Sequence, residues 1–315
     1  MSNYDKNYIS QKAGELNFIR DTLEKVYRLA DILEYLNTNP LLKESLALKG
    51  GTAINLTIFS LPRLSVDIDL DYMKPVSKGE MLLHRELINN DIFKYMNSTR
   101  YALSPKSKSP HSLDSWVFEY VGSCGGNRDN IKIEINYSMR HHILPALEMP
   151  IVPDHFSSEY RITSLSAIEI FASKINALLG RAAARDLYDV CNMIHFGLFD
   201  KSDYPLLRKS VAFYAAISAK TVNKTFDMSA IDKLTNYKIR TDLLPVLRKK
   251  EPFDLEASKT AAKIFISNLM VLSQNEQEFL NAFENKEYKP ELLFEDVEIL
   301  KRIKDHPMAL WKTAR

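Results

Sequence analysis

Three aspartates occupy alternate positions in the segment DIDLD, residues 67 to 71. Because side chains alternate between the two faces of a strand, Asp67, Asp69 and Asp71 would share one face, and the intervening isoleucine and leucine would form an apolar face. Like charges in neighbouring positions repel each other, and a hard cation such as Mg²⁺ or Mn²⁺ relieves that repulsion. The pattern predicts a metal site or, alternatively, a strand whose acidic face is turned to solvent.

A second strand pattern supplies a further carboxylate. In NIKIEINYS, residues 130 to 138, isoleucines alternate with polar residues, one of which is Glu134. If this strand pairs beside the strand of Asp67 and Asp69, Glu134 joins them on the polar face. Two carboxylates on one strand and one on its neighbour suit phosphoryl transfer, in which metal ions stabilise the attacking and leaving oxygens.

Gly50 and Gly51 separate a short apolar strand pattern, residues 46 to 49, from a helical pattern that runs to residue 59. Two glycines at such a junction allow close approach of the backbone, and the free N–H groups of the following turn favour a phosphate. Thr52 would add a hydroxyl donor. The same glycines also fit a plain turn, so the phosphate interpretation depends on their position just ahead of the acidic strand.

A second cluster of charge lies in the helical part of the chain. Lys174, Arg181 and Arg185 are seven and four residues apart and would fall on one stripe of a helix at about 100° per residue, provided that Gly180 does not interrupt it. Such a stripe suits a triphosphate, although a solvated basic face has the same pattern. Asp186 could orient Lys174, serve as a base or pair with a neighbouring arginine.

The periodicity of the remaining chain predicts the elements that position these residues. Helices are expected at 6–37 and 78–96, and strands at 46–49, 65–72, 101–103, 116–121 and 131–137. From residue 164 onward nearly every segment has a helical pattern. The expected fold class is α+β, with a small mixed sheet and helices in an N-terminal lobe (1–160, including an N-terminal helix) and an all-helical lobe (161–315).

Four segments in order resemble the AbiEii/AbiGii toxin family, within the nucleotidyltransferase superfamily that includes DNA polymerase β: LKGGTAINL, RLSVDIDL, IKIEI and EIFASKINALLGRAAARDLYDV. The resemblance covers roughly residues 45 to 196. It implies a nucleotidyltransferase-like N-terminal lobe and metal-dependent transfer of an NMP from an NTP to an acceptor, with release of pyrophosphate. The implied acceptor is the 3′ end of tRNA, the implied role is that of a toxin, and the implied partner is a cognate antitoxin encoded nearby.

The resemblance also implies roles for individual residues. The candidate catalytic residues are Asp67, Asp69, Glu134, Lys174 and Asp186, of which Asp67, Asp69 and Glu134 would bind Mg²⁺ or Mn²⁺. The candidate nucleotide-binding residues are Gly50, Gly51, Thr52, Arg63, Ser65, Lys174, Arg181 and Arg185. The extra Asp71 allows a 69/71 ligand pair by spacing alone, whereas the register of the family favours 67/69.

Composition limits the remaining function classes. The 315 residues carry 42 Lys+Arg and 40 Asp+Glu, a net charge of +2 that makes no case for bulk nucleic-acid binding, so an RNA acceptor would need a local basic surface. Candidate positions for it are Lys106, Lys108, Arg208, Lys209 and Arg248 to Lys250. The N-terminus lacks an apolar core typical of a signal peptide, and no apolar stretch approaches the length of a membrane span, which predicts a cytoplasmic protein without membrane contact. Two alternatives stay open: nucleotidylation of a protein, and a non-catalytic nucleotide-binding module.

Overall fold

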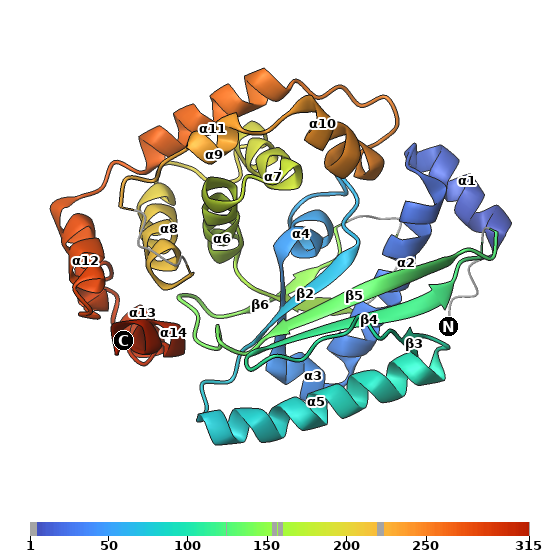
Figure 1. The fold of residues 1–315 in the computed structure, drawn as a ribbon, viewed down its shortest axis with the longest axis horizontal. Coiled ribbons are helices and arrows are strands. Elements are labelled where there is room, and N and C mark those ends of the chain that lie inside the picture. The colour runs from blue at the N-terminus through green and yellow to red at the C-terminus, as the bar shows by residue number, and fades with distance from the viewer. Residues whose placement is uncertain (1–4, 124, 153–155, 157–159, 219–223, 315) are drawn as a thin grey trace. The chain divides into compact units, whose positions relative to one another are not determined.

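The computed structural model describes residues 5–314 except 124, 153–155, 157–159 and 219–223. The chain forms two compact units (Figure 1). The first unit comprises residues 1–140, 146–165 and 245–251, and the second comprises 141–145, 166–244 and 252–315. Within the described ranges, no helix is both long enough and apolar enough to cross a membrane.

The first unit is organised around a mixed sheet of seven strands in the order β3-β4-β5-β2-β1-β7-β6. Its strands are β1 (Leu46–Lys49), β2 (Asp67–Tyr72), β3 (Ala102–Leu103), β4 (Leu113–Val121), β5 (Arg128–Asn136), β6 (Leu147–Pro150) and β7 (Arg161–Ser164). Its helices are α1 (Lys6–Leu16), α2 (Arg20–Thr38), α3 (Pro40–Ser45), α4 (Gly50–Ala53), which continues into a π-helical turn (Ile54–Ile58), and α5 (Lys78–Ser98). Strands β6 and β7 were not predicted, because their four-residue sequences, LEMP and RITS, lack a sustained apolar alternation.

The expected pairing of the two central strands is confirmed. β2 runs parallel to β5 and antiparallel to β1, and Asp69 lies opposite Glu134 on one side and Lys49 on the other. The isoleucines that alternate with these polar residues, including Ile68 and Ile133, are fully buried. Period-two alternation thus separates an apolar face from a face that carries the carboxylates.

Helices α2 and α5 cover the apolar face of the sheet. The ring of Phe93, on α5, packs edge-on against Trp116 and Phe118 of β4, with centroids 5.0 and 6.0 Å apart. Tyr35 of α2 stacks on Tyr95 of α5 at 3.9 Å, which joins the two helices. The polar side chains of β2 and β5 therefore lie on the face directed away from α2 and α5.

The single helix expected at 6–37 is wrong, because the chain breaks it between α1 and α2. Asn17 adopts a left-handed conformation, with φ of 60°, which asparagine tolerates better than most residues. A distant segment fixes it there: Lys249 N donates to Asn17 O at 2.6 Å, and Asn17 Nδ2 donates to Lys249 O at 2.9 Å. Arg248 donates to Leu16 O at 2.8 Å, so this arginine of the candidate basic run has a structural contact.

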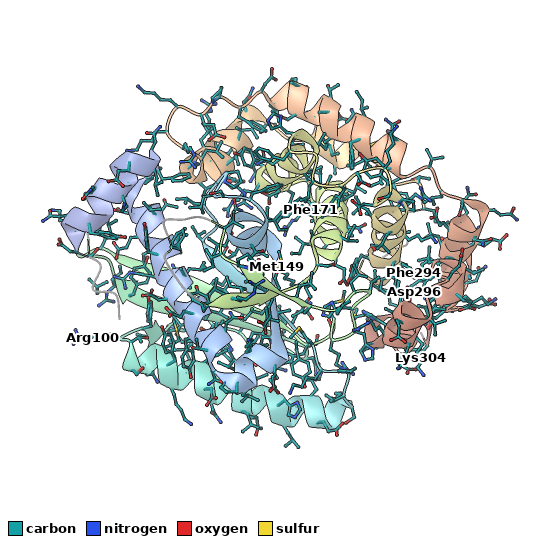
Figure 2. All side chains as sticks on the ribbon, turned by 180° about the vertical axis from the view of Figure 1, so that it is seen from behind. Arg100, Met149, Phe171, Phe294, Asp296 and Lys304 are labelled. Carbon is teal, nitrogen blue, oxygen red and sulfur yellow. The ribbon has the colours of Figure 1, made fainter. Side chains whose placement is uncertain are left out.

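Every element described in the second unit is a helix or a helical turn. The helices are α6 (Ala167–Gly180), α7 (Ala184–His195), α8 (Tyr204–Ser218), α9 (Ser229–Asp232), α10 (Asn236–Lys238), α11 (Leu255–Leu269), α12 (Gln274–Glu284), α13 (Val297–Ile303) and α14 (Pro307–Thr313). A π-helical turn (Ile239–Leu243) follows α10, and a 3-10 turn (Pro290–Leu292) follows α12. Aromatic side chains contribute to the core of the second unit. Phe171 packs on Phe199, and Phe294 packs on Phe213, in edge-to-face pairs. Phe171 and Phe294 are labelled in Figure 2.

Candidate active site

The three aspartates of β2 have different environments. Asp67 and Asp69 are half-buried, whereas the side chain of Asp71 is only 4% exposed. Lys49 Nζ lies 2.6 Å from Asp71 Oδ1, so the lysine that precedes the two glycines neutralises the third aspartate. This ion pair engages Asp71 and favours Asp67 and Asp69 as the ligand pair.

The two glycines are held directly against the acidic strand. Gly50 has φ of 69°, a left-handed conformation that glycine adopts without strain, and a Cβ atom there would lie 2.6 Å from Asp69 Oδ2. A Cβ atom at Gly51 would lie 2.6 Å from Arg63 Nη2 and 2.9 Å from Ser65 Oγ. A side chain at Gly50 would strain the left-handed backbone and displace the Asp69 carboxylate, and a side chain at Gly51 would displace Arg63 and Ser65.

Two polar side chains of the helical run fix the turn to its surroundings. The Thr52 hydroxyl donates to Asp67 O at 2.5 Å, so it anchors the acidic strand. Asn55, fully buried, donates from Nδ2 to Gly51 O at 2.6 Å and accepts from Arg63 N at 3.2 Å. Asn55 was not among the residues predicted from the sequence, although it is a polar residue, four positions after Gly51, in the otherwise apolar stretch AINL.

Glu134 lies beside Asp69 but has its own partner. Its Oε1 is 2.9 Å from Lys132 Nζ. Among the residues that the structure describes, no three His, Cys, Asp or Glu side chains are grouped so that they could hold a metal ion by themselves. Mg²⁺, however, needs only one or two carboxylates when water and substrate phosphates supply its other ligands. Asp67 and Asp69 fit that donor set, and Glu134, whose Oε1 is paired with Lys132, could join them through Oε2.

The candidate residues of the helical motif lie in the second unit. Lys174 is buried on α6, with Nζ 3.0 Å from Asp186 Oδ1 and 3.1 Å from Asp189 Oδ2, both buried on α7. Arg181 Nε lies 2.9 Å from Asp186 Oδ2, and the Arg181 side chain is 70% exposed. Asp186 therefore joins a buried lysine to a solvent-accessible arginine.

The single basic stripe expected for Lys174, Arg181 and Arg185 is wrong. The helix ends at Gly180, Ala182 has a positive φ of 45°, and a new helix starts at Ala184. Lys174 and Arg185 therefore belong to different helices, and Arg185 Nε donates to the backbone oxygen of Asp242 at 3.0 Å. Convergence on Asp186, rather than a common helical face, is what brings Lys174 and Arg181 together.

This cluster makes the stability of the second unit depend on pH. Burial alone would raise the pKa of Asp186, but Lys174 and Arg181 outweigh it and hold that pKa below its ordinary value of 3.8. A carboxyl with a lowered pKa stabilises the folded state above its ordinary pKa, and this contribution is lost as the pH falls through the folded-state value.

We expect Lys174→Gln to move this loss of stability to higher pH. Without the lysine, burial raises the pKa of Asp186, and each unit of that rise corresponds to about 1.4 kcal/mol. The free energy of unfolding, measured in urea between about pH 3 and pH 7, should begin to fall at least about one pH unit earlier than in the wild type. Lys201→Gln removes an exposed lysine of the same unit and serves as the control. Parallel pH profiles for Lys174→Gln and wild type would show that the lysine does not set the pKa.

Comparison with known proteins identifies the family of the chain and structures with a similar fold. A family model described as "Nucleotidyl transferase AbiEii toxin, Type IV TA system" matches residues 31–285. No curated protein matches the chain. The structure is similar to that of MenT4, a nucleotidyltransferase toxin from Mycobacterium tuberculosis H37Rv, with a TM-score of 0.63 and 16% identity over 98% of this chain and 99% of that one. It is also similar to JHP933 from Helicobacter pylori, with a TM-score of 0.50 and 18% identity over 85% and 99% of the two chains. At these identities the two structures show a shared fold.

Proposed function

The chain belongs to the family of AbiEii nucleotidyl transferase toxins of type IV toxin–antitoxin systems, and we propose that it transfers an NMP from an NTP to the 3′ end of tRNA. Membership of this family makes the protein a nucleotidyltransferase and implies an NTP substrate and a cognate antitoxin. The tRNA acceptor and a requirement for Mg²⁺ or Mn²⁺ are the further content of the proposal. Its proposed place of action is the cytoplasm, where that acceptor is found.

The observation that carries the proposal is the contact between the glycine turn and the aspartate strand. Gly50 approaches Asp69 so closely that a Cβ atom would overlap the carboxylate, and Thr52 ties the same turn to Asp67. Phosphates bound by the turn would therefore lie next to carboxylates able to hold a divalent cation. A phosphate cradle and metal ligands in direct contact are what transfer from a triphosphate requires.

The proposed roles follow from these positions. Asp67 and Asp69 would hold the metal, with Glu134 beside them, and the backbone N–H groups at Gly50 and Gly51 would bind phosphate. When bound, the metal would polarise the phosphoryl group and neutralise charge on the leaving pyrophosphate. Buried Arg63 backs Gly51, and Ser65 lies against the same turn.

Three cations of the second unit have a proposed role in binding the triphosphate. Lys174, Arg181 and Arg185 are the proposed triphosphate-binding cations, and Asp186 orients the first two through the contacts described above. In the proposed reaction, the 3′ hydroxyl of the acceptor forms a bond to the α-phosphorus, and the bond to pyrophosphate breaks. Positioning and electrostatic stabilisation supply most of the rate enhancement in such transfers, so no covalent nucleophile is needed.

The proposal is tested by identifying the acceptor. We expect that sequencing of cellular RNA 3′ ends after brief induction will show added nucleotides on tRNA. Purified protein incubated with each labelled NTP, with Mg²⁺ or Mn²⁺, should label a tRNA pool and leave a protein pool unlabelled. Label confined to protein would replace the tRNA proposal with protein nucleotidylation, and absence of label in both pools would favour a non-catalytic module.

A further inference from the structure

We propose that the sheet face carrying Asp67 and Asp69 continues into a basic track that binds the phosphodiester backbone of the RNA acceptor. The basic track consists of Lys108, Arg128 and Lys132. The inference rests on the proposed function, because it concerns how the acceptor of that reaction is held. It adds a surface that leads away from the carboxylates across the same sheet.

The strand register determines on which face of the sheet Arg128 and Lys132 lie. Lys132 lies directly opposite Asp67 in the parallel pairing of β5 with β2. Residues at even spacing along a strand share a face, so Arg128 and Lys132 point to the same side of β5 as Glu134. The Cα atoms of Arg128 and Lys132 are about 13 Å apart, at ~3.3 Å per residue. Lys132, paired with Glu134, marks where the acidic part of this face meets the basic part.

A row of directly opposed residues across the sheet shows on which face Lys108 lies. Ser115 of β4 lies opposite Glu134, and Lys108 lies opposite Ser115 in an antiparallel bridge. Lys108 and Ser115 exchange two backbone hydrogen bonds, at 2.9 and 2.8 Å. Directly opposed residues of a pair share a face. The row Asp69, Glu134, Ser115, Lys108 therefore puts Lys108 on the carboxylate face, about 14 Å from Asp69 at ~4.8 Å per strand.

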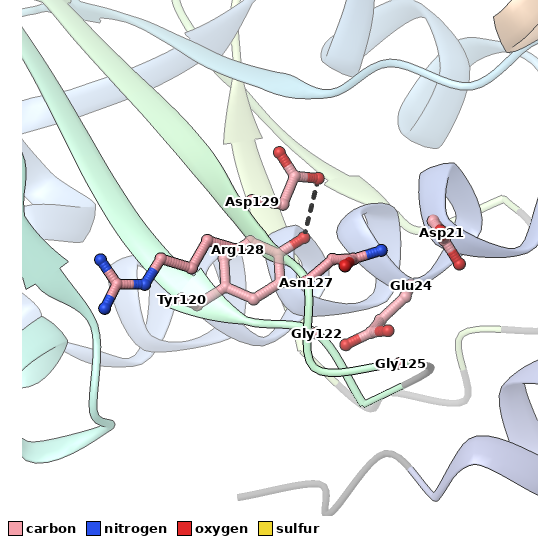
Figure 3. A pocket seen from close by; sticks show the side chains of 8 residues that line it. All are labelled: Asp21, Glu24, Tyr120, Gly122, Gly125, Asn127, Arg128 and Asp129. Atoms are coloured by element: carbon pink, nitrogen blue, oxygen red, sulfur yellow. Dashed lines mark hydrogen bonds between the residues drawn. The ribbon is translucent and has the colours of Figure 1, made fainter.

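The two outer cations are available to a polyanion. Lys108 and Arg128 are both exposed, and within the described part of the chain neither forms an ion pair. One acidic residue, Glu119, lies on the same face, opposite Asn130 of β5, and its carboxylate accepts from the Ser104 hydroxyl at 2.7 Å. Asp21, Glu24 and Asp129 line, together with Arg128, a cavity of about 170 Å³ at the end of the β4–β5 hairpin, and Figure 3 shows the guanidinium of Arg128 directed away from these three carboxylates.

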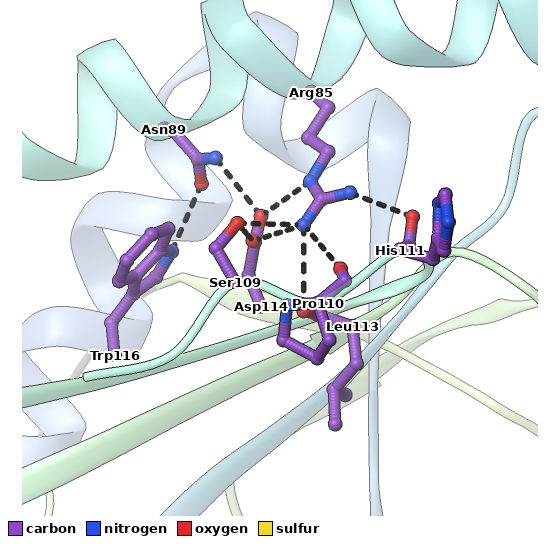
Figure 4. A network of polar contacts seen from close by, with 8 residues as sticks. All are labelled: Arg85, Asn89, Ser109, Pro110, His111, Leu113, Asp114 and Trp116. Atoms are coloured by element: carbon purple, nitrogen blue, oxygen red, sulfur yellow. Dashed lines mark hydrogen bonds and ion pairs between the residues drawn. The ribbon is translucent and has the colours of Figure 1, made fainter. Parts of the chain in front are cut away.

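A buried network holds the segment that follows Lys108. Arg85 of α5 donates to Ser109 Oγ at 2.8 Å, Pro110 O at 2.9 Å and His111 O at 2.9 Å, and its guanidinium pairs with the carboxylate of Asp114 (Figure 4). The bridge to Ser115 holds the other side of the segment. A cation on a segment fixed in this way loses little conformational freedom on binding.

The chemistry of this surface favours RNA phosphates over a protein. With a net charge of +2, the chain attracts a polyanion only through a local group of cations, and the basic track provides one that leads to the carboxylates. Phosphate contacts of this kind depend strongly on salt and little on sequence, which suits a surface that positions a strand without reading its bases.

The test is the double variant Lys108→Gln/Arg128→Gln, assayed with tRNA and NTP. We expect the KM for tRNA to rise at least about tenfold at moderate salt, and the slope of log affinity against log salt to decrease by about 1.5, for two lost phosphate contacts. The KM for NTP and the kcat at saturating tRNA should stay unchanged, because neither residue touches the proposed metal or the glycine turn. The conservative pair Lys108→Arg/Arg128→Lys should keep the wild-type KM.

The matched control is Lys78→Gln/Lys94→Gln, which removes two cations from α5, on the opposite side of the sheet. It should leave the KM for tRNA and its salt dependence unchanged. If the track variant matches this control while the wild type modifies tRNA, the basic track is overturned and the proposed function stands. If the wild type labels protein and not RNA, the proposed function is overturned, and the basic track with it.

Discussion

Replacing Asp69 with asparagine is expected to lower the rate of nucleotide transfer at least ~100-fold, roughly 3 kcal/mol of transition-state stabilisation. Asparagine keeps the shape of the side chain but removes the charge that would hold a divalent cation beside the glycine turn. Folding should be little affected, since the substitution relieves repulsion with the neighbouring aspartates. The measurement is kcat/KM with saturating Mg²⁺, together with the free energy of unfolding in the absence of metal.

Asp71→Asn is the matched control, because it makes the same chemical change on the same face of the same strand. Asp71 is paired with Lys49 and is not a proposed ligand, so we expect at most a few-fold change in activity. Asp67→Asn should behave like Asp69→Asn. Near-normal activity of Asp69→Asn with Mg²⁺, or a larger loss for Asp71→Asn, would show that the ligand pair is wrong.

The largest expected effect on stability comes from Asp114→Ala. Asp114 is completely buried, and its carboxylate accepts from Arg85, Ser109 and Asn89 (Figure 4). Removal of this carboxylate leaves the charged guanidinium of Arg85 without its ion-pair partner, although the Arg85 side chain is only 11% exposed. Loss of one partner of a buried ion pair typically costs about 3–5 kcal/mol. We expect a loss of that size in the free energy of unfolding measured by urea denaturation.

Two further variants make this result specific to the buried charge. Glu44→Ala breaks an exposed ion pair with Lys74, in which the glutamate side chain is 70% exposed, and should cost no more than about 1 kcal/mol. The double variant Arg85→Met/Asp114→Leu removes both charges and should be less destabilised than Asp114→Ala, because no unpaired charge stays buried. A double variant as unstable as Asp114→Ala would mean that packing and hydrogen bonds, not the unpaired charge, carry the effect.

Local sequence determined the polar face of each of the two central strands. Alternation in DIDLD and in IKIEI places Asp67, Asp69 and Glu134 on the polar side, because side-chain direction along a strand depends only on position parity. The pairing of β2 with β5, which the sequence left as a condition, is parallel in the structure and sets Asp69 opposite Glu134. The Gly50-Gly51 turn was also visible, because glycine is the residue that tolerates a left-handed backbone and close approach.

Contacts between residues far apart in sequence were decided only by the tertiary structure. Three such contacts depend on the path of the chain between the partners. They are the ion pair of Lys49 with Asp71, the hydrogen bond from Thr52 to Asp67, and the contact of Asn17 with Lys249 at the end of α1. Helical periodicity likewise predicted one stripe for Lys174 and Arg181, but a break of a few residues changed the direction of the second helix.

In the basic track, the sequence determines the face of two cations, and the tertiary structure determines the face of the third. The sequence places Arg128 and Lys132 on the Glu134 face, because even spacing along a strand is local geometry. No periodicity in the turn-rich segment around Lys108 indicates which face it joins. That position depends on the bridge to Ser115 and on the Arg85 network, whose partners lie more than twenty residues from the arginine. Local spacing determines the direction of a side chain within an element, whereas its partners depend on which elements the tertiary structure brings together.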